Sequence, residues 1–272
     1  MNIKDGHVHT NYCPHGTPEP IKNYIERAIQ LGYRQITFTE HSPLPKEFND
    51  PAPTSDSSMA PDQLLDYIKE LKDLKKQYQS KIQIKIGLEV DYIEGWEKST
   101  KEFLDEVGPM LDDMILSVHF LRHDNKWFCI DFSDKEFANI VQAYGSVDSI
   151  YLDYYRTLEK SILCDLGRYK PKRIGHISLV SKFQKIYPSQ VDSEHLLFHI
   201  LKLIKNHGYE LDVNTAGLFK PYCEETYPPL NIIREAAQMN IPLVYGSDAH
   251  HPSDLGRGLE VIRNLKLNED LI

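Results

Sequence analysis

The sequence predicts an α/β fold in which a ring of parallel strands is closed by an outer layer of helices. Apolar runs with β-branched residues alternate with stretches of helical periodicity about seven times along the 272 residues. The order is strand, helix, strand throughout, which is typical of a parallel barrel. The length suits one large barrel, so we expect residues 1–272 to form a single domain.

Four strands and three helices are expected in the first part of the chain. The first strand is predicted at residues 3–8 and the first helix at 21–31, where Ile21, Ile25 and Ala28 share one face. Pro61 stands near the start of another helix, a position that favours proline. The remaining strands are predicted at 35–39, 82–90 and 114–118, and the remaining helices at 61–79 and 97–107.

The rest of the chain is irregular at first and then resumes the same order. A stretch that holds Trp127 and Asp131 shows no clear period, and one or two helices follow between 135 and 166. A segment rich in Pro and Ser, from Ser42 to about Pro61, is too long for a plain connection, and we interpret it as a lid. The last strands are predicted at 173–177, 210–214 and 243–246, and the last helices at 193–206, 230–239 and 255–265.

Composition narrows the class of protein. With 41% hydrophobic and 26% charged residues, the chain can build a sizeable core as a globular protein. The net charge of -9 argues against nucleic acid as a partner. The start lacks an apolar leader and no stretch approaches a membrane span, so we expect a cytoplasmic protein without a membrane partner. The four cysteines are far apart, which predicts buried, reduced thiols and no thiolate zinc site.

Residue types that bind metals gather where the expected strands end. Period-two geometry puts His7 and His9 on one face of the first strand, where both can reach one metal ion. Only the sixth strand, ending at Asp212-Val213-Asn214, has neither His nor Glu at its tip. The ends of the other strands hold His7 and His9 with His15 beyond, Glu40 and His41, Glu89, His119, His176, and Asp248 with His250.

Convergence separates these residues from ordinary histidines. A single histidine at a strand end is more often a structural or surface residue than a ligand. A parallel barrel, however, brings all its strand ends to one rim, where packing does not call for a ring of imidazoles and carboxylates. His251 follows His250 directly and is expected to contact the substrate or to support a ligand. The remaining histidines are expected not to be ligands: His123, His195, His199 and His207.

These motifs resemble the polymerase and histidinol phosphatase (PHP) superfamily and, within it, the histidinol-phosphate phosphatases. The matching segments occur in the order of the family and span nearly the whole chain. They are Asp5-Gly6-His7-Val8-His9-Thr10, Thr39-Glu40-His41, Gly87-Leu88-Glu89-Val90, Ser117-Val118-His119, Gly175-His176 and Ser247-Asp248-Ala249-His250. The resemblance implies a distorted (β/α)7 barrel, similar to a TIM barrel, that holds up to three divalent metal ions at the carboxyl ends of its strands.

The resemblance also implies which residues hold each ion. His7, His9, Glu89 and Asp248 would bind the first, and Glu89 would bridge to a second held by His119 and His176. His15, His41 and His250 would bind the third. Imidazole and carboxylate ligands suit Zn, Mn or Fe. A hydroxide between the first two ions would attack phosphorus, and Asp248 or His250 would protonate the leaving alkoxide.

The implied reaction is hydrolysis of L-histidinol phosphate to L-histidinol and phosphate, in histidine biosynthesis. Arg156 and Arg257 are the candidate phosphate-binding cations, because guanidinium binds phosphate in a bidentate way. Asn214 and His251 are further candidate substrate contacts. The substrate ammonium has three candidate partners: Asp131, Asp153 and Glu224. Two alternatives stay open, another small phosphate ester as substrate and a non-catalytic metal-binding module. The oligomeric state cannot be read from the sequence.

Overall fold

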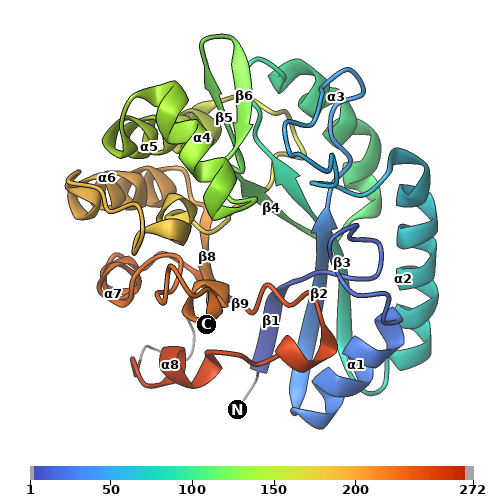
Figure 1. The fold of residues 1–272 in the computed structure, drawn as a ribbon. Coiled ribbons are helices and arrows are strands. Elements are labelled where there is room, and N and C mark those ends of the chain that lie inside the picture. Colours follow the sequence, from blue (N-terminus) through green and yellow to red (C-terminus); the bar gives the residue numbers. More distant parts are fainter. Residues whose placement is uncertain (1–2, 267–272) are drawn as a thin grey trace.

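The computed structural model describes residues 3–266, in which seven parallel strands form a nearly closed ring (Figure 1). Their order around the ring is β1-β2-β3-β4-β7-β8-β9, the order along the chain, and every ladder between neighbours is parallel. This confirms the predicted distorted barrel. The strands are β1 Ile3–Val8, β2 Tyr33–His41, β3 Gln83–Asp91, β4 Asp113–Ser117, β7 Arg173–Ile174, β8 Glu210–Asn214 and β9 Leu243–Gly246.

The ring is completed where its first and last strands meet. β1 and β9 share a single parallel bridge, between Val8 at the last position of β1 and Ala249 beyond the end of β9. Two backbone hydrogen bonds hold this junction: the His9 amide donates to the Ala249 carbonyl at 3.0 Å, and the Asp248 amide donates to the His7 carbonyl at 2.9 Å. The junction therefore fixes the backbone beside the expected ligands of both strands.

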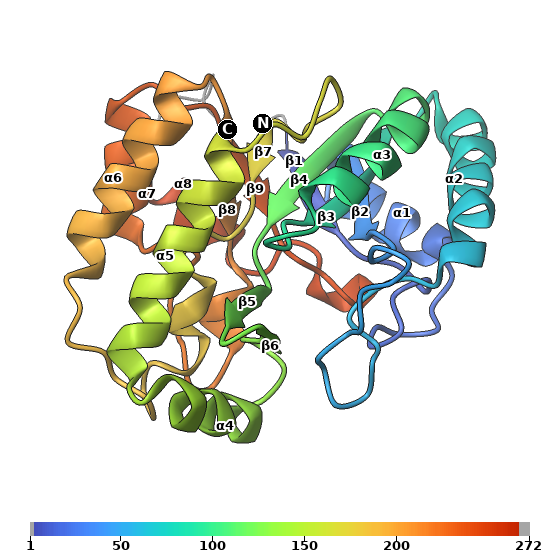
Figure 2. The ribbon, with the colours of Figure 1, turned by 90° about the horizontal axis from the view of Figure 1, so that it is seen from above.

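Helices cover the outside of the ring. Figure 2 shows α1 to α3 against one side and α5 to α8 against the other. Ser133, Ser146 and Asp192 cap the starts of α4, α5 and α6 with side-chain oxygens that accept a backbone N–H. The helices are α1 Ile21–Gln30, α2 Leu64–Tyr78, α3 Glu97–Val107, α4 Asp134–Tyr144, α5 Val147–Leu163, α6 Ser193–Asn206, α7 Leu230–Gln238 and α8 Leu259–Arg263. Short 3-10 turns occupy Pro61–Gln63, Gly108–Met110, Leu179–Phe183, Ala216–Phe219 and Pro252–Asp254.

Three local predictions need correction. The stretch expected to be irregular forms an antiparallel hairpin of β5 Phe120–His123 and β6 Lys126–Cys129. The strand expected at 173–177 pairs only over Arg173–Ile174. The helix expected at 255–265 begins at Leu259, because Gly256 and Gly258 both have positive φ (83° and 71°) and keep the preceding chain out of helical geometry.

The amino end of the barrel is closed by a buried ion pair. Arg173 is 1% exposed, and its guanidinium lies 3.2 Å from the Asp113 carboxylate. It occupies space that only glycine leaves free, since a Cβ on Gly6 would come within 2.1 Å of Arg173 Nη1. Of the helices in residues 3–266, none has the length and apolar character to cross a membrane.

Candidate metal centre

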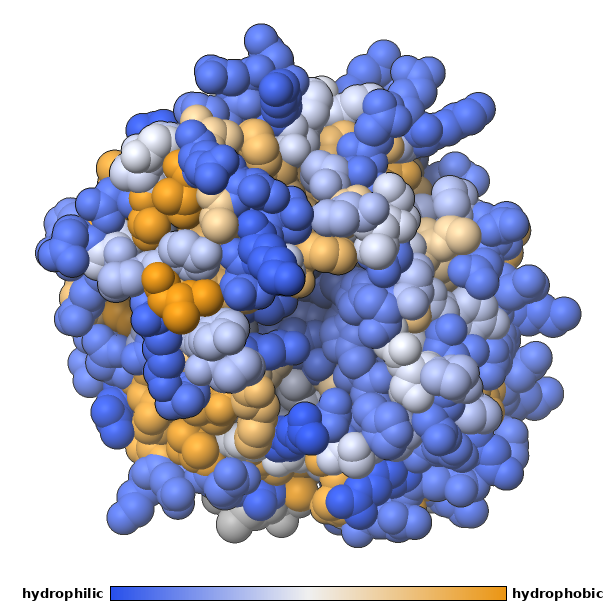
Figure 3. Space-filling model, in the orientation of Figure 1, coloured by the Kyte–Doolittle hydropathy of each residue, from blue (hydrophilic) through white to orange (hydrophobic). Residues whose placement is uncertain are grey.

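The predicted ligands meet at the carboxyl ends of the strands, around one cavity of about 390 Å³. Figure 3 shows this hollow as a recess with mostly hydrophilic walls. His7 and His9 lie beneath its floor and are fully buried. The other predicted ligands line it: His15, His41, Glu89, His119, His176, Asp248 and His250. The structure thus brings all nine predicted ligands to one place.

Glu89 is the centre of this arrangement. Its Oε2 lies 3.2 Å from His7 Nε2, 3.5 Å from His9 Nε2 and 3.3 Å from His41 Nδ1. Its Oε1 lies 2.8 Å from His176 Nε2 and 3.8 Å from His119 Nε2. The carboxylate therefore stands between two groups of imidazoles, a position from which one oxygen can serve each of two cations.

Asp248 reaches the same centre from the last strand. Its Oδ1 lies 3.1 Å from His9 Nε2 and 3.7 Å from His7 Nε2. The residue has a φ of 54°, in the left-handed region that Asp tolerates better than most residues. Asn214 donates to Asp248 Oδ2 at 3.1 Å. The amide predicted to contact substrate thus positions a carboxylate instead, and it does not line the cavity.

Three further carboxylates hold the imidazoles from behind; the sequence analysis noted Glu40 at a strand end but assigned a role to none of the three. Asp212 Oδ2 lies 2.9 Å from His7 Nδ1 and Glu40 Oε1 lies 3.1 Å from His9 Nδ1. In the same way, Asp91 Oδ1 lies 2.7 Å from the Nδ1 atom of His119. Such pairs fix the ring so that Nε2 points at the centre, and they make the imidazole a stronger metal ligand. A period-two signal could have found Asp91, which stands two residues after Glu89 on the same strand face.

Close packing around these pairs requires glycine at two positions. A Cβ on Gly246 would lie 2.6 Å from Asp212 Oδ1 and 2.7 Å from His7 Cβ. A Cβ on Gly175 would lie 2.3 Å from Ser117 Oγ, the hydroxyl that donates to Glu89 Oε1 at 2.6 Å. The two glycines thus leave room for the groups that orient His7 and Glu89.

The carboxylates and imidazoles of this centre shift one another's pKa values. Burial alone would lower the pKa of His9, but its contacts with Asp248 and Glu40 raise that pKa to about 9. Burial also lowers the pKa of His119, but the Asp91 carboxylate outweighs burial and raises that pKa to about 10. Although burial disfavours an ionised carboxyl, the surrounding imidazoles hold the pKa of Glu89 well below its usual range. The centre thus holds ionised carboxylates that would attract cations.

Several buried nitrogen atoms of the centre have no hydrogen-bond partner within residues 3–266. They are His9 Nε2, His41 Nδ1, His176 Nδ1 and His250 Nε2. Unsatisfied buried polar atoms are costly, and a bound cation would satisfy imidazole lone pairs directed at it. The donor atoms also fall into compact sets, each with all its atoms within 4.8 Å of one another. The sets are His7, His9 and Glu89; Glu89, His119 and His176; and His9, Cys13, His41 and His250.

His15 lies at the edge of the centre and is more exposed than the other ligands. Its Nδ1 lies 3.1 Å from the Asp56 carbonyl oxygen, in the segment that we interpreted as a lid. Its ring centroid is 5.1 Å from that of His41 and 5.2 Å from that of His250. The sulfur of Cys13 belongs to a compact donor set, whereas the ring of His15 does not.

The predicted substrate contacts divide into one that lines the cavity and others that do not. Arg257 lines it, packs over the Phe219 ring at 5.2 Å and pairs with Asp254 at 2.9 Å. Arg156 lies on the exposed face of α5, 3.6 Å from Asp153, because the buried face of that helix carries its tyrosines. His251 is exposed and caps the 3-10 turn that follows it. Arg156 and His251 are therefore corrected to surface positions.

Charged residues missed by the sequence also line the cavity. Lys182, within one 3-10 turn, and Lys220, directly after another, bring ammonium groups to its wall, and neither belongs to a recognisable sequence motif. Lys182 pairs with Asp131 at 3.0 Å, and this contact, acting against burial, holds the pKa of Asp131 below its usual range. Of the proposed partners for an ammonium group, Asp131 lines the cavity, whereas Asp153 and Glu224 do not.

Comparisons with known proteins agree with this geometry. The PHP domain family model matches residues 5–216. The histidinol-phosphatase of Bacillus subtilis (strain 168) is 48% identical over 263 residues, which cover 96% of this chain and 98% of that protein. The crystal structure of the hisK protein from Listeria monocytogenes superposes with a TM-score of 0.91 at 42% identity, covering 95% of this chain and 99% of the other.

A more distant solved structure shares the fold. The histidinol phosphate phosphatase of Lactococcus lactis subsp. lactis Il1403, complexed with Zn, L-histidinol and phosphate, gives a TM-score of 0.73 at 20% identity. The match covers 97% of this chain and 94% of that one.

Proposed function

The chain belongs to the PHP domain family, and from this premise we propose that it is a metal-dependent phosphatase that hydrolyses L-histidinol phosphate to L-histidinol and phosphate. One observation carries the proposal: five imidazoles surround the buried Glu89 carboxylate at 2.8 to 3.8 Å, at the floor of a cavity. The likeness to a curated histidinol-phosphatase across nearly the whole chain supports the substrate. We further propose that residues 1–272 form one catalytic domain that acts in the cytoplasm, in keeping with amino-acid biosynthesis.

We assign the first two divalent ions to compact donor sets and the third to the histidines at the edge of the centre. His7, His9, Glu89 and Asp248 would hold the first ion, and Glu89, His119 and His176 the second. His15, His41 and His250 would hold the third. Zn, Mn and Fe suit these ligands, and Zn is bound by the related enzyme of Lactococcus lactis. Bound ions would supply positive charge to polarise the phosphoryl group and would lower the pKa of a nearby water.

The side chains of the protein would transfer protons and bind the substrate. Asp248 is ionised with Oδ1 directed at the first ion, and it can take a proton from the attacking water at Oδ2, the oxygen that Asn214 holds. Asp248 and His250 are the candidate proton donors to the leaving alkoxide, because both line the cavity. Arg257 and Lys220 can bind phosphate oxygens, and Asp131 can bind the substrate ammonium. A substrate that carries both a phosphate and an ammonium group matches this mixed wall.

The decisive test compares L-histidinol phosphate with other phosphomonoesters, using protein reconstituted with Zn or Mn. We expect kcat/KM to favour L-histidinol phosphate over simple esters such as glycerol phosphate, because the cavity offers partners for both charged groups. Equal values would remove the named substrate and leave a phosphatase of another specificity. If no small ester released phosphate, the alternative of a non-catalytic metal-binding module would be favoured.

A further inference from the structure

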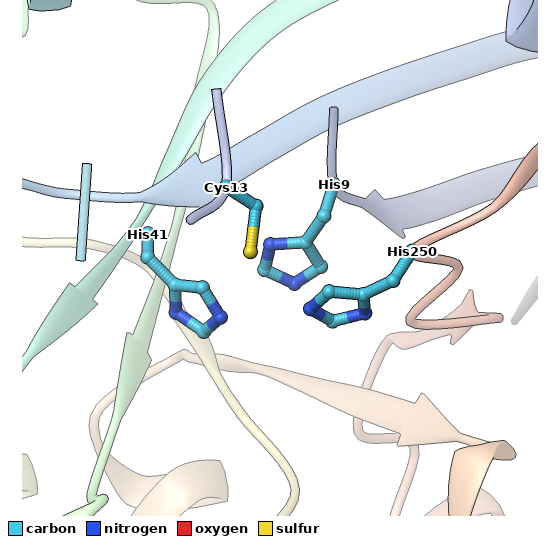
Figure 4. A group of neighbouring side chains, drawn as sticks. All are labelled: His9, Cys13, His41 and His250. Atoms are coloured by element: carbon cyan, nitrogen blue, oxygen red, sulfur yellow. The ribbon is translucent and has the colours of Figure 1, made fainter. Parts of the chain in front are cut away.

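We propose that the thiolate of Cys13 is a ligand of the metal ion that His41 and His250 hold. The inference rests on the proposed function only in that an ion must occupy this position. The sequence predicts no thiolate site, because the four cysteines are far apart along the chain. The fold nevertheless brings one of them to the centre, and Figure 4 shows its sulfur directed toward the His9 ring, close to His41 and His250.

The positions of the four side chains support a shared ligand. One donor atom from each of His9, Cys13, His41 and His250 lies within 4.8 Å of all the others. Cys13 is 4% exposed, so its sulfur faces the interior. The side chains come from separate segments: the turn after β1, the end of β2 and the stretch after β9. No local sequence pattern brings them together, so their convergence comes from the fold.

A second observation points to a ligand at this place. His41 Nδ1 is buried without a hydrogen-bond partner in the described part of the chain, on a residue that is 7% exposed. His250 Nε2 lacks a partner there as well. Buried polar atoms are nearly always satisfied. A cation beside the thiolate would satisfy imidazole nitrogens that face it.

The backbone fixes the cysteine in this position. The Cys13 amide donates to the Thr10 carbonyl at 3.2 Å, and the Gly16 amide donates to the Cys13 carbonyl at 3.1 Å. Thr10 is held by Glu40, whose Oε2 accepts its amide at 2.8 Å and its hydroxyl at 2.6 Å. The other oxygen of Glu40 binds His9 Nδ1 at 3.1 Å. One buried carboxylate therefore positions both the turn that carries the thiol and the neighbouring imidazole.

The types of ligand determine which metal ion this position favours. His9 Nε2 lies 3.1 Å from Asp248 Oδ1, so His9 belongs to the first ion. Cys13 would therefore join His15, His41 and His250 around this ion, one thiolate beside three imidazoles. A thiolate favours Zn or Fe over Mn or Mg. When the metal–sulfur bond forms, the thiol proton leaves to solvent, and the ion keeps a net charge of about +1.

Cobalt substitution tests the ligand directly, because a bond from thiolate sulfur to Co²⁺ gives a near-ultraviolet charge-transfer band that imidazole does not. Metal-free protein is titrated with Co²⁺ under reducing conditions, and bound cobalt is counted per chain. We expect the band in the unaltered protein and its loss in Cys13→Ser. The control Cys129→Ser, which alters the cysteine that lines the cavity, should keep it.

A protein that binds cobalt without the band, or a Cys13→Ser variant that keeps it, would overturn the proposal. A variant that replaces Cys129, Cys164 and Cys223 keeps the test valid if Cys13→Ser does not fold. With Cys13 as the sole cysteine, the band must remain. Chelator competition should show a loss of at least about tenfold in Zn affinity for Cys13→Ser, with a smaller loss for Mn.

Phosphate release is measured separately on the same samples. A band without hydrolysis would refute the proposed function and keep the ligand, whereas hydrolysis without a band would refute the ligand alone.

Discussion

The histidines at the barrel rim and those on the outer helices differ in what holds their rings. At the rim, His7, His9 and His119 each have a buried carboxylate at Nδ1, at 2.7 to 3.1 Å. On the outside, His199 meets a half-exposed glutamate, and His207 meets a carbonyl of its own helix. The imidazoles are chemically the same, but only those at the rim have fixed orientations around a common centre.

A functional site is therefore marked by the partners of its histidines. An exposed imidazole pair contributes little because water and salt screen it. A buried imidazole with a carboxylate behind it is costly to assemble, and its other nitrogen is directed where a cation can sit. Substitutions in matched pairs, one at the rim and one outside, test this comparison.

The largest expected effect comes from removing a ligand. His119→Asn or Asp248→Asn should reduce phosphate release by about a thousandfold or more, because a metal ion supplies several kcal/mol of transition-state stabilisation. His199→Asn on α6 should keep a near-normal rate. Circular dichroism would check that the fold is intact. Near-normal rates in both rim variants would refute the metal centre as assigned.

A smaller effect is expected from the carboxylates behind the rings. Asp91→Asn should weaken metal binding about 10- to 100-fold, because the amide holds the His119 ring less firmly and makes it a poorer ligand. Excess metal should restore much of the activity. Glu159→Gln, which alters the outer pair with His199, is the matched control. Equal metal affinity in the two variants, measured by chelator competition, would show that the buried carboxylate does not support its metal ligand.

Metal binding should also depend on pH. In metal-free protein the pKa of His9 is raised to about 9 and that of His119 to about 10, so both rings are protonated at neutral pH. Because the pKa values of these histidines are higher in the folded protein, their ion pairs stabilise the metal-free fold fully at a pH below the pKa of an unfolded histidine. That stabilisation is lost as the pH rises through 9 to 10. A ligand must be deprotonated, so binding at pH 7.5 should release about two protons from these residues. Calorimetry in buffers of different ionisation enthalpy measures this release. Metal binding without proton release would contradict the prediction.

The smallest expected effect comes from a pair of arginine substitutions. Arg257→Ala should lower kcat/KM about tenfold or more, mainly through KM, because a charged hydrogen bond to phosphate contributes about 1.5–3 kcal/mol. Arg156→Ala should leave kcat/KM unchanged, since that side chain pairs only with Asp153 on the outside of α5 within the described structure. If Arg156→Ala had the larger effect, the assignment of the cavity wall would be wrong.

Much of the fold could be predicted because its signals are local. The apolar runs of the barrel strands and the amphipathic faces of the helices are visible within short windows of sequence. The β5–β6 hairpin was missed because its strands have four residues each and its turn uses Asp124 and Asn125 at positive φ. The short β7 was overextended, since the apolar pattern continues past Ile174 where the ladder stops.

The site was predicted only in part for a related reason. Position at a strand end is a local property, and it identified the residues that gather at the rim. Pairing is not local: His7 and its carboxylate Asp212 are 205 residues apart, and His119 and Asp91 are 28 apart. Cys13 was read as an ordinary thiol because sequence spacing does not reveal its neighbours across the ring.

The junction of β1 with β9 has a consequence for how the enzyme is made. His7 and His9 leave the ribosome well before Asp248 and His250. A nascent chain that lacks the final strand therefore has neither the hydrogen bonds that close the ring nor a complete ligand set for the first ion. Once bound, that ion would tie the two ends of the barrel together as a cross-link does, closing a loop of almost the entire chain. Metal loading would then act as a checkpoint that only chains with the last strand of the barrel pass.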